Sequence, residues 1–309
     1  MNLLFAIDRH FIPHLLNCLR SIALRGGAES YHAYILHSDL TGEDMGAVRA
    51  GAPEGVTCHF TAVPESLFAD FPETDRYPQQ IYYRLAAPLL LPRSLDRILY
   101  LDVDIIIINS LVPLYESSFE GNLFMACTHT NDVVTKLNRV RLGLDPDSPV
   151  PYINTGVMMM NLPPLRQTLD MDAIRNYAAE KRYALMLPDQ DILTALYGDR
   201  VKLLDTMLYN LSDRTLNAYN ANPRHEKRDV DWVRKNSVVI HYLGKNKPWL
   251  PGYSGVLDVF YHEIVPQEAP KALSRWQIFG DCDKIELFCI MCCQQHGKLE
   301  FDGPTVKAS

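Results

Sequence analysis

The chain has 309 residues, of which 47% are hydrophobic and 22% charged, and this composition is typical of a globular protein with one large α/β domain or two small ones. A formal net charge of −7 argues against a general nucleic-acid-binding surface, so we expect no nucleic-acid partner. The odd number of cysteines, seven, and the scatter of the first three predict reduced thiols in a cytoplasmic protein. The start of the chain lacks the features of a secretion signal, and no run approaches the ~18 apolar residues of a membrane span.

Apolar runs and helical patterns alternate over the first part of the chain. We expect strands at 3–7, 31–37 and 56–63, with helices beginning at Pro13 and near Thr41. This order predicts an α/β fold with a mainly parallel central sheet flanked by helices. Ligands of such sheets bind beyond the carboxyl ends of the strands, and Asp8 lies at such an end.

Residues 97–110 contain the most informative stretch. The apolar run 98–101 predicts a strand buried on both faces, and Asp102 and Asp104 follow it within an apolar context. A buried carboxylate costs several kcal/mol unless a cation or solvent compensates it. Alternate residues of an extended chain point the same way, so both carboxylates can reach one ion, for which Mg²⁺ or Mn²⁺ is suitable. Because the chain holds six Asp-x-Asp pairs, only this context favours a metal site over a structural pair.

The middle of the chain predicts further elements of the same fold. We expect helices at 80–91, 132–142 and 165–183, strands at 122–128 and 152–161, and another helix from Pro188. Arg84, on the first of these helices, is either aimed at a phosphate or exposed on an amphipathic surface. Met158–Met160 are expected in the core. Asp189 and Asp191 fall in the first turn of this last helix, so structural roles are the alternative to a functional one. Asp189 would then be the N-terminal cap and Asp191 a partner of the helix dipole.

Polar residues after a late strand form the second informative motif. We expect strands at 201–204 and 238–242, with 213–236 as a surface loop over the crevice. His241 lies near the end of the last of these strands, and Gly244, Lys245 and Lys247 follow it. Imidazole can complete a carboxylate metal shell, glycine admits backbone close to oxygen and lysine supplies charge, which together suit a pyrophosphate. A buried core histidine remains the alternative.

Six motifs in this order resemble glycosyltransferase family 8, most closely the bacterial retaining hexosyltransferases that extend lipopolysaccharide or capsule glycans. The motifs lie at 5–8, 83–85, 100–104, 154–157, 189–193 and 241–249, and the resemblance spans residues 2–265. It implies the GT-A fold, a Rossmann-like nucleotide-diphospho-sugar transferase fold with a mixed, mainly parallel central sheet flanked by helices. It also implies a UDP-hexose donor carrying galactose or glucose, Mn²⁺ (or Mg²⁺) as cofactor, and an oligosaccharide or glycolipid acceptor.

The resemblance also implies roles for individual residues. Asp102, Asp104 and His241 correspond to the metal ligands, and Lys247 to the residue that neutralises the leaving UDP. Asp189 and Gln190 correspond to residues beside the donor sugar. The remaining donor contacts would come from Ala6, Asp8, Arg84, Val103, Asn154 and Gly244. Arg9 and His10 depart from the family, which has a second acid and an asparagine there. An amide is a poor nucleophile, so we favour same-face attack and an α-linked product.

Other functions stay open at this point. They are a self-glucosylating, glycogenin-like primer, a sugar-nucleotide-binding protein without transfer, and a nucleotidyltransferase. Residues 8–13 lack the Gly-rich basic loop typical of the last class.

We expect a catalytic domain at 1–265 and a C-terminal extension at 266–309. The extension would pack on the domain or contact the inner face of the cytoplasmic membrane peripherally. The spacing of its Cys289, Cys292, Cys293 and His296 does not favour zinc.

Overall fold

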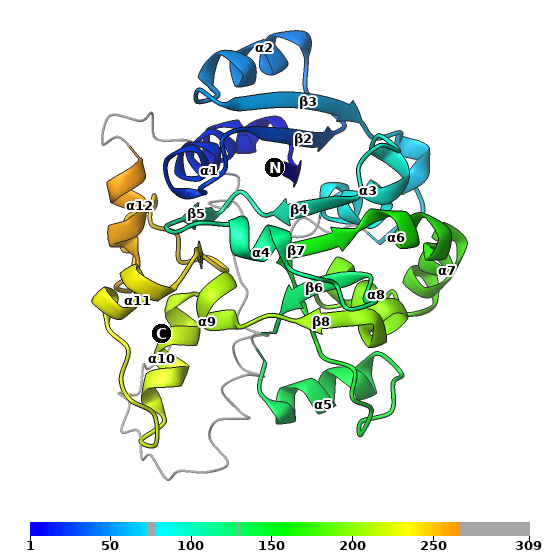
Figure 1. Ribbon diagram of the computed structural model, residues 1–309. Coiled ribbons are helices and arrows are strands. Elements are labelled where there is room, and N and C mark those ends of the chain that lie inside the picture. The colour runs from blue at the N-terminus through cyan, green and yellow to red at the C-terminus, as the bar shows by residue number, and fades with distance from the viewer. Residues whose placement is uncertain (73–77, 129, 266–309) are drawn as a thin grey trace, which may run out of the picture.

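A mixed, mainly parallel sheet of seven strands forms the centre of the molecule (Figure 1). The computed structural model describes residues 1–72, 78–128 and 130–265. The strand order is β3-β2-β1-β4-β7-β6-β8, and β7 is antiparallel to both its neighbours, whereas the other pairs are parallel. These strands are β1 Asn2–Ala6, β2 Tyr31–His37, β3 Val56–Ala62, β4 Arg97–Leu101, β6 Phe124–Cys127, β7 Asn154–Asn161 and β8 Val201–Leu203. The sequence-based prediction of the sheet is confirmed.

A small second sheet pairs β5 (Ile105–Ile107) with β9 (Val239–His241), antiparallel. The α-helices are α1 Ile12–Arg25, α2 Gly42–Gly51, α3 Tyr83–Leu90, α4 Val112–Glu116, α5 Asp132–Arg141, α6 Leu162–Thr168, α7 Met171–Glu180, α8 Pro188–Tyr197, α9 Thr206–Tyr209, α10 Asp213–Ala221, α11 Val230–Asn236 and α12 Asp258–Ile264. Short 3₁₀ helices are η1 Arg9–Phe11, η2 Glu65–Leu67, η3 Gln79–Tyr82 and η4 Gly198–Arg200. Helices α10, α11 and α12 gather beside β5 and β9 (Figure 1).

Each central strand buries alternate residues in two cores, one on each face of the sheet. In β7, Met158 and Met160 pack with α3, α6 and α8, whereas Val157 and Met159 pack with α1 on the opposite face. The methionine stripe is therefore core, as predicted. Burial on both faces explains why these strands appear in the sequence as unbroken apolar runs.

Two predicted elements differ from the structure. The long helix expected at 165–183 is two helices, because Asp170 leaves the helical path and caps α7 by accepting the N–H groups of Asp172 and Ala173. The loop expected at 213–236 contains α10 and α11. Ser212 and Asp229 cap them through the N–H groups of Thr215 and Trp232. Both helices are short and mainly polar, so the caps rather than apolar periodicity mark their starts.

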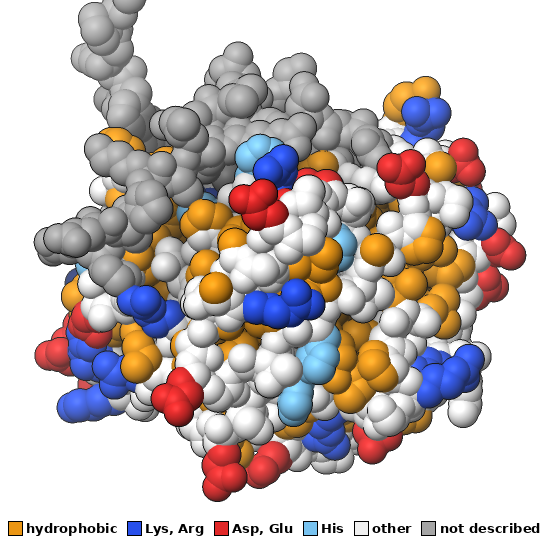
Figure 2. All heavy atoms as spheres, turned by 90° about the horizontal axis from the view of Figure 1, so that it is seen from above, with side chains coloured by type: hydrophobic (Ala, Val, Ile, Leu, Met, Phe, Trp, Pro, Cys, Tyr) orange, Lys and Arg blue, Asp and Glu red, His pale blue; other side chains and the backbone are white. Residues whose placement is uncertain are grey.

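Strand β3 lies at one edge of the sheet, beside α2. The guanidinium of Arg49 from α2 lies 4.8 Å from the centre of the Phe60 ring on β3. Figure 2 looks onto this side of the molecule and shows acidic and basic side chains interspersed among apolar ones over its described part. Charged neighbours of this kind protect an exposed edge strand from pairing with another chain.

Within the three described ranges, no helix is long and apolar enough to cross a membrane. The predicted extension at 266–309, with its cysteine cluster, lies outside the described residues.

Candidate active site

The first side of the site is the shared edge of β1 and β4, which are parallel neighbours with Leu4 opposite Tyr100. Ala6 ends β1 and Asp8 lies just beyond it, at the same edge of the sheet where Asp102 follows β4. Asp8 is buried and caps η1, with its Oδ1 accepting the N–H of His10 at 2.8 Å. The side chains of Arg9 and His10 are exposed.

Asp102, Asp104 and His241 lie together, and one ligand atom from each falls within 4.8 Å of the others. The two aspartates flank the turn from β4 to β5, and His241 stands opposite Ile105 in the β5–β9 pair. His241 Nε2 is 3.1 Å from Asp104 Oδ1 and 3.7 Å from Asp102 Oδ2. Carboxylate oxygens with one imidazole nitrogen form a donor set that fits Mn²⁺ or Mg²⁺.

Gly156 in β7 makes room for this cluster. A Cβ atom there would lie 2.3 Å from His241 Cε1 and 2.7 Å from Asp102 Oδ2. Any other residue would displace both side chains. The sequence places Gly156 in the 154–157 motif but gives it no role, because the clash involves strands distant in the chain.

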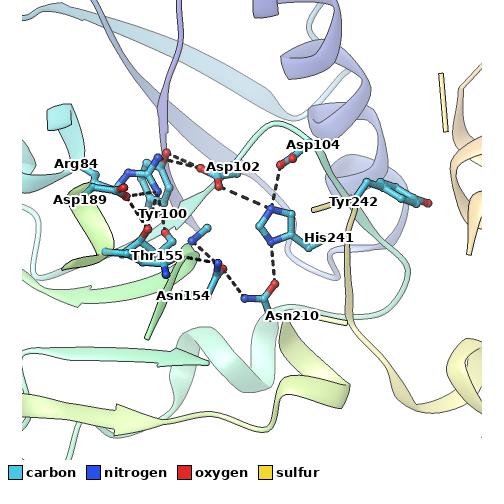
Figure 3. A network of polar contacts seen from close by, with 12 residues as sticks. Arg84, Tyr100, Asp102, Asp104, Asn154, Thr155, Asp189, Asn210, His241 and Tyr242 are labelled. Atoms are coloured by element: carbon cyan, nitrogen blue, oxygen red, sulfur yellow. Dashed lines mark hydrogen bonds and ion pairs between the residues drawn. The ribbon is translucent and has the colours of Figure 1, made fainter. Parts of the chain in front are cut away.

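Arg84, in the first turn of α3, joins the cluster to a second acid (Figure 3). Its Nη2 is 3.1 Å from Asp102 Oδ1 and its Nη1 is 3.2 Å from Asp189 Oδ2. The guanidinium carbon lies 4.2 Å from the centre of the Tyr100 ring. Burial favours a lower pKa for Arg84, but Tyr100, Asp102 and Asp189 raise it above its ordinary value. The alternative of a surface arginine is wrong.

The first turn of α8 presents Asp189 and Gln190. Asp189 Oδ2 accepts the Thr155 hydroxyl at 2.6 Å, and burial raises the pKa of Asp189 although Arg84 opposes this. Leu187 occupies the N-cap position, so the alternative of Asp189 as the helix cap is wrong.

Asp191 belongs to the support of this turn. Its side chain is fully buried, pairs with Arg141 at 2.7 Å and accepts the Tyr152 hydroxyl at 2.8 Å. Its Oδ2 also accepts the N–H groups of Met186 and Leu187, which fixes the start of α8.

Buried amide side chains connect the cluster of Asp102, Asp104 and His241 to the first turn of α8, and Figure 3 shows two of them, Asn210 and Asn154. His241 Nδ1 is 2.8 Å from Asn210 Oδ1, and Asn210 Nδ2 donates to Asn154 Oδ1 at 2.7 Å. Asn154 Nδ2 in turn donates to Gln190 Oε1 at 2.9 Å. Asn210 directly follows the short helix α9, and nothing in the sequence around it distinguishes it from a loop residue.

Lys247 and Gly244 lie in the loop after β9. Lys247 Nζ is 2.5 Å from Asp104 Oδ2 and also donates to the carbonyl of Tyr242. Burial favours a higher pKa for Asp104, but Lys247 and His241 hold it well below its usual range. Gly244 has a φ of 73°, in the left-handed region that favours glycine.

Comparison with known proteins identifies the family of the chain. Residues 2–251 match the sequence profile of Glycosyl transferase family 8, and the chain belongs to that family. It is therefore a glycosyltransferase, as its six motifs indicate.

The chain is 31% identical over 186 residues to a lipopolysaccharide 1,2-glucosyltransferase of Escherichia coli, which covers 58% of this chain and 52% of that enzyme. It is 24% identical over 258 residues to the lipopolysaccharide 1,3-galactosyltransferase of Salmonella typhimurium, covering 80% of this chain and 72% of that enzyme.

A solved structure shares the fold. The galactosyltransferase LgtC, in complex with donor and acceptor sugar analogues, matches with a TM-score of 0.71 and 25% identity over 88% of this chain and 100% of LgtC. The predicted GT-A fold is confirmed.

Proposed function

We propose that this protein is a retaining, Mn²⁺-dependent transferase that moves galactose or glucose from a UDP-sugar to a glycan acceptor and forms an α linkage. One observation carries the proposal. The cluster of Asp102, Asp104 and His241 adjoins the buried set of Arg84, Asp189 and Gln190, so a metal-binding half and a sugar-binding half meet in one site.

In the metal half, Asp102, Asp104 and His241 would hold Mn²⁺ (or Mg²⁺), which when bound supplies Lewis acidity to a departing diphosphate. Lys247 adds a positive charge beside Asp104, where negative charge develops on the leaving UDP. Gly244 presents backbone without a side chain to the same group. Donor contacts by Ala6, Asp8 and Val103 at the β1 and β4 edge complete the nucleotide side of the proposal.

In the sugar half, Asn154, Asp189 and Gln190 are buried and held by hydrogen bonds. Fixed polar groups of this kind suit a ligand with many hydroxyls. Arg84 Nε is buried and has no hydrogen-bond partner among the described residues, which supports a contact with donor phosphate or sugar oxygen. Because the amide of Gln190 is uncharged, we infer same-face attack in which Gln190 stabilises developing charge.

Residues 1–265 would carry this activity, with 266–309 as an extension that packs on the domain or contacts the membrane surface. The names of the relatives favour an oligosaccharide or glycolipid acceptor of the lipopolysaccharide type. We further propose a place at the inner face of the cytoplasmic membrane.

The test is a screen of UDP-glucose, UDP-galactose and their N-acetylated forms for Mn²⁺-dependent hydrolysis and transfer. Asp102→Asn serves as the matched control, since it removes one charge from the cluster but keeps the side-chain shape. Turnover by the wild type and none by Asp102→Asn supports the proposal. A wild type that consumes none of these donors, or an Asp102→Asn variant of full activity, refutes it.

A further inference from the structure

We infer that Asn210 is a positioning residue that sets the proton location on His241 and the orientation of Gln190. This inference rests on the proposed function and adds a residue that none of the six motifs contains. It depends on identifying which amide atoms are oxygens and which are nitrogens, because the two are interchangeable by a simple flip.

A backbone group fixes the first assignment. The N–H of Gly156 lies 3.1 Å from the Oδ1 position of Asn154, and a backbone N–H can only donate, so that atom is oxygen. The nitrogen of Asn154 therefore faces Gln190 and donates to its Oε1 at 2.9 Å.

The same reasoning extends from Asn154 to the metal cluster. Because Asn154 Oδ1 is an acceptor, the atom of Asn210 that lies 2.7 Å from it is the nitrogen. The oxygen of Asn210 then faces His241 at 2.8 Å, so the neutral imidazole carries its proton on Nδ1. The lone pair of Nε2 is thereby directed at Asp102 and Asp104, as a metal ligand requires.

Asn210 opposes a competing arrangement. Asp104 Oδ1 lies 3.1 Å from His241 Nε2 and on its own would favour the imidazole that carries its proton on Nε2. That form donates to Asp104 and has no lone pair on Nε2, the nitrogen that faces the two aspartates. Asn210 is 1% exposed, so it holds its two hydrogen bonds without competition from water.

Two substitutions separate the two tasks of Asn210. Asn210→Asp still accepts from His241 Nδ1 but cannot donate to Asn154, whereas Asn210→Leu does neither. Asn109→Leu is the control, because the side chain of Asn109 also makes two hydrogen bonds. It donates both, to the carbonyls of Arg234 and Ser237, and it lies beyond the end of β5 that is away from His241.

Three readouts test the inference on the full chain. They are the ¹⁵N NMR shifts of His241, assigned with a His241→Gln variant, Mn²⁺ binding in the presence of UDP followed by electron paramagnetic resonance, and donor hydrolysis. We expect the Nδ1–H form in the wild type and in Asn210→Asp, and the Nε2–H form in Asn210→Leu. Mn²⁺ affinity should fall ~10- to 100-fold in Asn210→Leu and stay near the wild-type value in Asn210→Asp. Hydrolysis should fall at least ~10-fold in both.

The outcomes distinguish this inference from the proposed function. A wild type that binds no Mn²⁺ with UDP refutes the proposed function. A wild type that binds Mn²⁺, together with an Asn210→Leu variant of equal affinity and unchanged tautomer, refutes the role of Asn210. Two results with Asn210→Asp also overturn the inference. One is donor hydrolysis at the wild-type rate, and the other is a fall in Mn²⁺ affinity as large as that in Asn210→Leu. Asn210→Asp provides this test even where Asn210→Leu does not fold.

Discussion

Replacing Gly156 of β7 with alanine places a methyl group against His241 and Asp102 and changes none of the proposed metal ligands. The new Cβ would lie 2.3 Å from His241 Cε1, whereas carbon atoms in contact are ~3.5–4.0 Å apart. His241 or β7 must therefore move by more than ~1 Å, and metal–ligand distances tolerate only ~0.2 Å. We expect Mn²⁺-dependent UDP binding to weaken by at least ~10- to 100-fold, which corresponds to ~1.4–2.7 kcal/mol.

The matched control is Gly46→Ala on α2, where an added Cβ has nothing within 4 Å. That change should raise the free energy of unfolding by ~1 kcal/mol through helix propensity and leave binding unchanged. Titration calorimetry with Mn²⁺ and UDP measures binding, and urea unfolding measures stability, where Gly156→Ala should cost ~1–3 kcal/mol through overpacking. A folded Gly156→Ala variant with wild-type Mn²⁺-dependent binding would refute the assignment of the cluster as the metal site.

Three further predictions concern Lys247, His14 and the C-terminal segment. Lys247→Ala should lower kcat more than it raises the donor KM, because leaving-group charge is greatest in the transition state; steady-state kinetics showing a change in KM alone would exclude that role. Burial, followed by the charge of Lys247, lowers the pKa of His14 from 6.5 to about 4, so the unfolded chain binds more protons between these pH values. The free energy of unfolding should therefore fall by up to ~3 kcal/mol as the pH drops through this window, and urea unfolding of His14→Phe, which keeps a ring against Trp249, should lack this contribution. An equal slope in both proteins would contradict it. A chain ending at Pro266 should keep Mn²⁺-dependent donor hydrolysis, and a folded truncation without hydrolysis would show that 266–309 completes the site.

The sequence predicts the sheet well, because strands buried on both faces must be continuous apolar runs. It also singles out Asp102 and Asp104, since two carboxylates in such a context need compensation. The direction of β7 is not predictable in this way, because a doubly buried strand has the same apolar pattern whether parallel or antiparallel.

The residues that support the site, like the direction of β7, are not predictable from the sequence. Gly156 is needed because a Cβ there would meet His241 and Asp102, which are distant from it in the chain. Asn210 reaches His241 because the segment after α9 pairs with β9, where Leu211 bridges Ile240 and its carbonyl accepts the N–H of His241. The sequence allows Arg84 to be aimed at a phosphate or exposed on an amphipathic helix. The structure decides between them, because Arg84 is buried and contacts Asp102 and Asp189. Local patterns therefore locate the charged groups, whereas the tertiary fold decides what holds them.

The stereochemistry of the product tests the proposed function most directly. An inverting enzyme needs a general base that takes the acceptor proton on the face opposite the leaving group. The residue that we place there is Gln190, whose amide cannot accept a proton and whose Oε1 is already bound by Asn154. With an α-linked UDP-hexose as donor, proton NMR of the product should show the anomeric coupling of an α linkage. A β-linked product would contradict the retaining mechanism and the role assigned to Gln190.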